Sequence, residues 1–183
     1  MKSEYALLIM DMFNPFDFPE GEKLCRRALP VAKNIRELKK TLKEKDVPVI
    51  YVNDNFGQWR SSWSDVYQSC TKEGKKGKEI AEILSPEEDD YFILKPKHSG
   101  FYQTPLDILL ENLHIRTLII TGIAGNICVL FTANDAHMRD YNVIVPKDCI
   151  ASNEKKDDED TLHQLSSVFG FPTPPHSEIR IKK

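Results

Sequence analysis

The chain has 183 residues and a formal net charge of −3, from 25 Lys and Arg against 28 Asp and Glu. With 40% hydrophobic and 29% charged residues, its composition excludes a wholly disordered protein and predicts one domain, residues 1–183, that buries its own core. The small acidic excess argues against a nucleic-acid-binding protein and against a basic protein of membrane surfaces.

Five short apolar runs predict β-strands in the order of the chain. They lie at residues 5–10, 48–52, 91–94, 117–121 and 142–145, and a sixth strand is expected at residues 178–181. The first four runs are nearly continuous rather than alternating, which is typical of parallel strands covered by helices on both faces.

Helical periodicity separates these runs. Between the first two strands, apolar residues recur at helical spacing from Leu24 to Leu42, with Pro30 placed to open a second helical segment. Further helices are expected at residues 78–84, 105–113, 126–139 and 158–169, whereas residues 61–78 are expected to form a loop or an irregular helix. The alternation of strand and helix predicts an open, doubly wound α/β sheet.

Reactive side chains follow several of the predicted strands. Asp11 ends the first, Asp54 follows the second, Lys95 ends the third, and Cys128 lies six residues after Gly122, which ends the fourth. Ligands of open α/β sheets bind beyond the carboxyl ends of the strands. We therefore expect a carboxylate, an ammonium group and a thiol to meet at one edge of the sheet.

The position of Cys128 suggests how its thiol could be activated. Asn126 is a good N-cap, which would place Cys128 in the first turn of the following helix. The positive end of that helix, together with Lys95, is expected to lower the thiol pKa, and Asp11 is expected to accept the proton.

Several other site types are disfavoured. No two glycines lie two residues apart and no GxxxxGK[ST] motif occurs, so a dinucleotide or nucleoside-triphosphate enzyme is not expected. The four cysteines show no CxxC spacing and the five histidines no metal-ligand spacing. The apolar run near the N-terminus is too short for a signal peptide, so a cytoplasmic protein is expected.

Three segments carry a specific pattern: LLIMD at residues 7–11, KPKHSGF at 95–101 and TGIAGNICV at 121–129. Their order and spacing resemble the isochorismatase-like cysteine hydrolases, a family that includes nicotinamidases and N-carbamoylsarcosine amidases. The resemblance spans most of the chain. It implies a three-layer α-β-α fold around a six-stranded, mainly parallel sheet of Rossmann-like order.

The resemblance also implies a catalytic triad of Asp11, Lys95 and Cys128, with Cys128 as the nucleophile. The amides of Ala124 and Cys128 would form an oxyanion hole, and the peptide bond before Ala124 would be cis. The implied reaction is hydrolysis of a C–N bond in a small amide or carbamoyl compound through a covalent thioester.

The alternatives are a vinyl-ether hydrolase of isochorismatase type, a non-catalytic protein that retains the fold, and a flavodoxin-like FMN carrier.

The sequence departs from the family pattern at the position of a metal site. Nicotinamidases resembling this chain carry Asp-x-His at a metal site, but here Asp54 is followed by Asn55 and Phe56. We therefore expect no metal and no cofactor.

Aromatic residues on the predicted loops are candidates for the pocket wall. Phe16, Trp59 and Phe101 are expected to contact substrate, or else to pack loops onto the sheet or fill a subunit interface. The expected partner is a small-molecule substrate, without nucleic acid or membrane. The resemblance further implies a homodimer or homotetramer.

Overall fold

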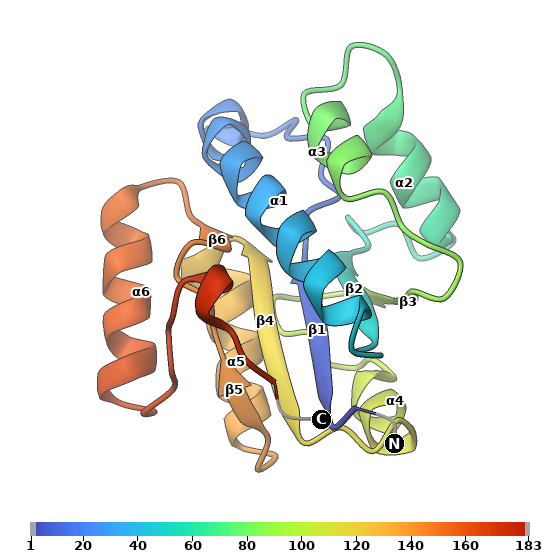
Figure 1. The fold of residues 1–183 in the computed structure, drawn as a ribbon. Coiled ribbons are helices and arrows are strands. Elements are labelled where there is room, and N and C mark those ends of the chain that lie inside the picture. Colours follow the sequence, from blue (N-terminus) through green and yellow to red (C-terminus); the bar gives the residue numbers. More distant parts are fainter. Residues whose placement is uncertain (1–2, 182–183) are drawn as a thin grey trace.

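The computed structural model describes residues 3–181, which contain one parallel sheet of six strands (Figure 1). The strand order is β3-β2-β1-β4-β5, and β6 pairs with β4. The strands are β1 (Tyr5–Met10), β2 (Val49–Asp54), β3 (Tyr91–Lys95), β4 (Thr117–Ile123), β5 (Asn142–Ile144) and β6 (Ile150–Ala151). The prediction of a six-stranded, mainly parallel sheet is confirmed.

Helices cover both faces of the sheet. They are α1 (Gly21–Lys43), α2 (Trp63–Thr71), α3 (Lys78–Ile83), α4 (Leu106–Asn112), α5 (Leu130–His137) and α6 (Lys155–Ser167), with a π-helical turn η1 (Gly125–Val129) and a 3₁₀ turn η2 (His176–Glu178). Apolar side chains of α1, α2 and α3 fill the core on one face, and those of α4, α5 and α6 fill the core on the other.

Strand β1 explains the continuous apolar runs. Leu7 and Ile9 point into the core beneath α1, whereas Leu8 and Met10 point into the core on the opposite face. Because successive side chains of a strand alternate between faces, a strand covered on both sides must be apolar at every position.

Residues 61–78 contain the regular helix α2, whose N-terminus is capped by Ser62, rather than the expected loop or irregular helix. Two further sequence-based predictions of secondary structure are wrong. Residues 178–181 do not form the sixth strand: they include the end of η2 and an unpaired extended segment, and β6 takes the sixth place. Pro30 does not divide the first helix, because α1 runs unbroken through it. Apolar residues on both sides of Pro30 bury the same face of the helix, and this packing outweighs the missing hydrogen bond.

The ends of β1 and β4 lie unusually close together. Gly122 has a φ of +110°, and a Cβ atom placed there would lie 2.1 Å from the carbonyl oxygen of Met10. Only glycine fits this conformation and this gap. The contact brings the segments that follow these two strands, and the side chains they carry, to the same edge of the sheet.

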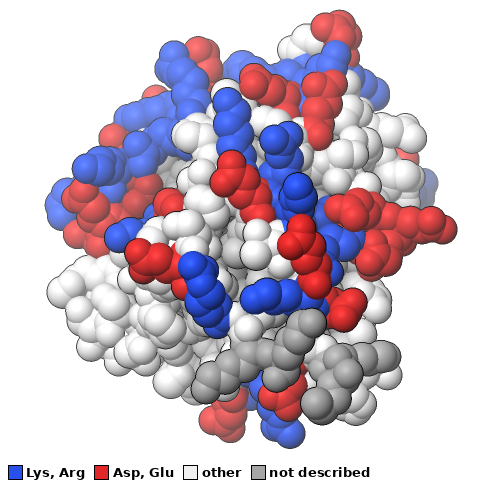
Figure 2. All heavy atoms as spheres, viewed as in Figure 1, with Lys and Arg blue, Asp and Glu red and all other residues white. Residues whose placement is uncertain are grey.

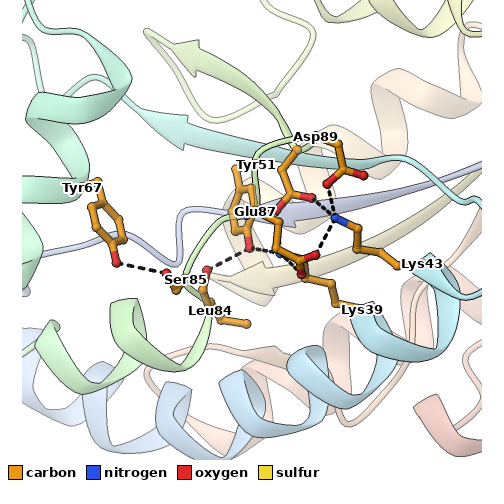
Figure 3. Close-up of polar contacts among 9 residues, drawn as sticks. Lys39, Lys43, Tyr51, Tyr67, Leu84, Ser85, Glu87 and Asp89 are labelled. Carbon is orange, nitrogen blue, oxygen red and sulfur yellow. Dashed lines mark hydrogen bonds and ion pairs between the residues drawn. The ribbon is translucent and has the colours of Figure 1, made fainter.

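An ion-pair network ties α1 to the segment before β3 (Figure 3). Lys39 Nζ lies 2.6 Å from Asp90 Oδ2 and donates to Tyr51 Oη at 3.1 Å. Lys43 Nζ lies 2.9 Å from Glu87 Oε2. Lys39 and Asp90 are both buried, and each has a second ion-pair partner: Glu87 for Lys39, at 3.2 Å, and Lys43 for Asp90, at 3.1 Å.

The face drawn in Figure 2 carries Lys and Arg interspersed with Asp and Glu, so neither sign dominates that side of the molecule. Among residues 3–181, no helix is both long enough and apolar enough to cross a membrane.

Candidate active site

Three elements deliver the predicted catalytic side chains to one edge of the sheet. Asp11 directly follows β1, Lys95 is the last residue of β3, and Cys128 lies in η1, which follows β4. In the sheet, β2 lies between β3 and β1, and β4 is on the other side of β1. The strands are parallel, so their carboxyl ends meet.

Lys95 is the centre of this site. Its Nζ lies 2.8 Å from Asp11 Oδ2 and donates to Cys128 Sγ at 3.5 Å. Asp54 Oδ2 lies 3.7 Å away on the open side. The side chain of Lys95 is 0% exposed, so its buried ammonium group is compensated chiefly by the carboxylate of Asp11.

The backbone holds Asp11 in one orientation. Its φ is +50°, an uncommon conformation for a residue other than glycine. Its N–H donates to the carbonyl of Val52 at 2.9 Å, and its Oδ1 accepts from the N–H of Asp54 at 2.6 Å. Oδ2 accepts no aligned hydrogen bond from the described residues, so its contact with Lys95 is chiefly an ion pair. Oδ2 therefore keeps a lone pair available.

Asn53 clamps the loop that carries Asp11. Its Oδ1 accepts from the N–H of Phe13 at 3.1 Å, and its Nδ2 donates to the carbonyl of Phe13 at 2.9 Å. The side chain is buried at the end of β2. The sequence alone indicates no role for Asn53, and its one signal is an amide at the end of an otherwise apolar run.

The electrostatics differ from the sequence-based expectation for the thiol. Burial, followed by the nearby Asp11 carboxylate, raises the pKa of Cys128, and Lys95 only partly opposes this. Burial also raises the pKa of Asp11. Burial would lower the pKa of Lys95, but Asp11 and Cys128 raise it overall. Burial therefore favours the neutral thiol over the thiolate, which is opposite to the lowered thiol pKa that the sequence led us to expect.

The helix around Cys128 also begins differently. Ala124, not Asn126, is the N-cap, and the N–H groups of Ile127 and Val129 both donate to its carbonyl, at 3.1 and 3.2 Å. The N–H of Asn126 instead donates to Ser152 Oγ at 3.0 Å. A π-helical turn of this kind inserts an extra residue before the regular helix. The preceding peptide bond, Ile123–Ala124, is cis.

The three aromatic candidates for substrate contact lie in different environments. Phe16 is 0% exposed and belongs to the core beneath α1, and Phe101 is buried in the opposite core. Both side chains pack their loops onto the sheet, which is the alternative that the sequence left open. Trp59 is 80% exposed on the loop after β2.

Asp54, which matches a metal ligand of nicotinamidases, makes contacts with protein groups here. Asp54 Oδ1 accepts from the N–H of Phe56 at 2.6 Å, and Oδ2 faces Lys95. Asn55 is buried and Phe56 is partly exposed. With one carboxylate already facing an ammonium group and no neighbouring imidazole, this donor set does not fit zinc or iron.

The chain is similar to proteins of one known family. A family model described as the isochorismatase domain matches residues 5–174. An uncharacterized isochorismatase family protein, YaaI of Bacillus subtilis, is 47% identical over 168 residues, which are 92% of each chain. The ureidoacrylate amidohydrolase RutB of Methylorubrum extorquens is 40% identical over 93 residues, 50% of this chain and 38% of RutB.

Among solved structures, the N-carbamoylsarcosine amidase from Thermoplasma acidophilum superposes with a TM-score of 0.74 and 28% identity. The superposition covers 99% of this chain and 100% of the amidase. The family model and the close relative each extend over nearly the whole chain. The chain therefore belongs to the isochorismatase family of hydrolases.

Proposed function

We propose that the protein is a cysteine hydrolase that cleaves a C–N bond in a small amide or carbamoyl-type substrate. The observation that carries the proposal is the contact of Lys95 Nζ with both Asp11 and Cys128, at 2.8 and 3.5 Å, within a buried site. The ureidoacrylate amidohydrolase and the N-carbamoylsarcosine amidase, by their names, act on compounds of this class.

In the first half of the reaction, Cys128 Sγ attacks the carbonyl carbon of the substrate. Because the raised pKa of Cys128 favours the neutral thiol, the thiol proton must leave as the C–S bond forms, and the Asp11 carboxyl group, which faces the same ammonium group, is placed to accept it. Asp11 then passes that proton to the leaving nitrogen as the C–N bond breaks. The products are a thioester on Cys128 and a free amine or ammonia.

In the second half, water attacks the thioester carbonyl and gives a proton to Asp11. The C–S bond breaks, the carboxylic or carbamic acid leaves, and the sulfur regains its proton. Lys95 remains protonated throughout and stabilises the negative charge as it moves between Asp11 and the sulfur. We assign the amides of Ala124 and Cys128 to the developing oxyanion, because both belong to the tight turn that presents the nucleophile.

A panel of small amides, ureido acids and carbamoyl amino acids, assayed for release of ammonia, tests the proposal. Turnover of at least one compound should fall by about 10³-fold or more in Cys128→Ala, because removing a nucleophile leaves only the binding contributions. Cys25→Ala is the matched control, since Cys25 lies on α1 and its thiol donates to the carbonyl of Lys76.

The alternative reaction gives the opposite result. An isochorismatase-type vinyl-ether hydrolase needs no nucleophile, so Cys128→Ala would leave its turnover of isochorismate intact. A wild-type protein that turns over neither the amides nor isochorismate would point to a non-catalytic member of the family.

A further inference from the structure

A second cluster of reactive side chains lies on the other side of the sheet from Cys128. It combines Asp148 and Cys149, in the segment between β5 and β6, with His176 at the start of η2. One ligand atom from each of the three lies within 4.8 Å of the others. His176 Nδ1 lies 2.8 Å from Asp148 Oδ2, and Cys149 Sγ lies 3.8 Å from Asp148 Oδ1.

This cluster is separate from the candidate active site. Cys149 is buried in the core beneath α1, whereas Cys128 packs against the core on the opposite face. Helix α1 contacts both β6 and η2, and in Figure 1 the red C-terminal turn lies beside α1 in front of β4. The proposed mechanism uses none of these three residues.

We propose that Asp148, Cys149 and His176 form a binding site for one zinc-type divalent transition-metal ion, with water as a fourth ligand. A thiolate and an imidazole favour zinc, cobalt or copper over magnesium and calcium, which take oxygen ligands. A thiolate and a carboxylate also neutralise the charge of a divalent cation, which a partly buried site requires.

The separations fit a small contraction around an ion. In a tetrahedral zinc site, oxygen and nitrogen ligands about 2.1 Å from the metal lie about 3.4 Å apart, and sulfur lies about 3.6 Å from either. Cys149 Sγ lies 3.8 Å from Asp148 Oδ1, and one ligand atom from each of the three residues lies within 4.8 Å of the other two. The 2.8 Å contact of Asp148 with His176 must open by about 0.6 Å, which a rotation of the partly exposed imidazole provides.

Neighbouring residues hydrogen-bond to Asp148 and His176 and orient them, as the residues around metal ligands do in known metal sites. Asp148 Oδ2 lies 2.8 Å from His176 Nδ1 and Glu37 Oε2 lies 3.3 Å from Nε2, so both ring nitrogens face carboxylates. An ion bound through Nδ1 would displace the Nδ1 proton, and Glu37 would then orient the ring through Nε2–H. The N–H of His176 donates to Asp148 Oδ1 at 2.8 Å, and Asn34 Nδ2 donates to the carbonyl of Asp148 at 2.7 Å. A bound ion would fasten the C-terminal segment to α1 and to the β5–β6 segment.

Cobalt(II) titration of the full chain, reduced and freed of metal by a chelator, tests the proposal. The titration uses the Cys128→Ser background, which removes the active-site thiol as a competing ligand. We expect one equivalent of cobalt to produce a thiolate-to-metal charge-transfer band with the visible bands of a four-coordinate ion, and zinc to displace both.

Variants in the same background identify the ligands. Cys149→Ser and His176→Gln should abolish the charge-transfer band, and Glu37→Gln should weaken cobalt affinity about tenfold or more through the orientation of the imidazole. His163→Gln is the matched control, because His163 lies exposed on α6. If Cys149→Ser fails to fold, His176→Gln and Glu37→Gln decide the question, with circular dichroism of the metal-free proteins reporting their folding.

Three results would overturn the proposal. The first is the lack of a charge-transfer band at millimolar cobalt in the folded parent protein. The second is a band that survives in Cys149→Ser or His176→Gln. The third is a band seen only when Cys128 is present, which would place the ion at the candidate active site.

Discussion

Replacing Lys95 by methionine tests the electrostatic core of the candidate site. The substitution keeps the volume of the side chain but removes the ammonium group that lies 2.8 Å from Asp11 Oδ2. Asp11 is 5% exposed, so its carboxylate would remain buried without a counter-ion. Breaking a buried ion pair on one side costs about 3–5 kcal/mol of folding free energy.

The stability lost in Lys95→Met should be smaller at low pH than at high pH. Burial already raises the pKa of Asp11, and without Lys95 the pKa rises further, so the folded variant binds a proton that the unfolded chain does not hold. The variant therefore gains stability relative to wild type as the pH falls, by at most about 1.4 kcal/mol per pH unit. Urea unfolding at about pH 5 and about pH 8 measures this difference.

Two further variants make the result decisive. Lys97→Met changes an exposed lysine two residues along the chain and should cost little at either pH. The double variant Lys95→Met with Asp11→Asn should recover much of the lost stability but no activity, because both charges are gone. If Lys95→Met is no more destabilising than Lys97→Met, or if its effect is independent of pH, the account of the buried pair is wrong.

Three other predictions follow from the same contacts. The kcat/KM for an active amide should fall as the pH drops through the pKa of Asp11, which burial raises above its usual 3.8, because a protonated Asp11 cannot accept the thiol proton. A kcat/KM that instead rises with ionisation of the thiol, at about pH 8 and above, would refute proton transfer from the thiol to Asp11. Lys39→Met should lower the free energy of unfolding by about 1–3 kcal/mol, because Lys43 Nζ, 3.1 Å from Asp90 Oδ1, still compensates the buried carboxylate, while Lys40→Met, at an exposed position, serves as the control in the same denaturation assay. Gly122→Ala should destabilise far more than Gly170→Ala in thermal unfolding, because both glycines have positive φ but only the first lacks room for a Cβ; equal shifts would mean that the close approach of β1 and β4 is not tight.

Much of the sheet could be predicted from the sequence, because a strand that is buried on both faces is a continuous run of apolar residues. The run at residues 5–10 coincides with β1, since every side chain there is apolar. The sixth strand was not predictable, because β6 is two residues long and carries no period. Ile179 and Ile181 alternate as a strand would, but both are buried beneath α1 without a neighbouring strand. Apolar residues at every second position therefore indicate that one face of an extended segment is buried, but not that the segment pairs with another strand.

Some features of the candidate site could also be predicted from the sequence, and others could not. Asp11, Lys95 and Cys128 could be brought together from the sequence because parallel strands end at one edge. The neutral state of the thiol could not, since it depends on how far burial outweighs Lys95. The packing of Phe16 and Phe101 depends on how the loops fold back, which residue type alone does not indicate. The cluster at His176 depends on the path of the C-terminal segment across α1.

Intact-mass spectrometry during turnover tests the central claim most directly. A substrate identified in the amide panel is mixed with enzyme and quenched in acid within the first turnovers, and peptide mapping locates any added mass. The account predicts an adduct equal to the acyl group on Cys128, released by hydroxylamine and absent from Cys128→Ala. Turnover with no adduct on Cys128, or with full rate in Cys128→Ala, would contradict covalent catalysis by this thiol.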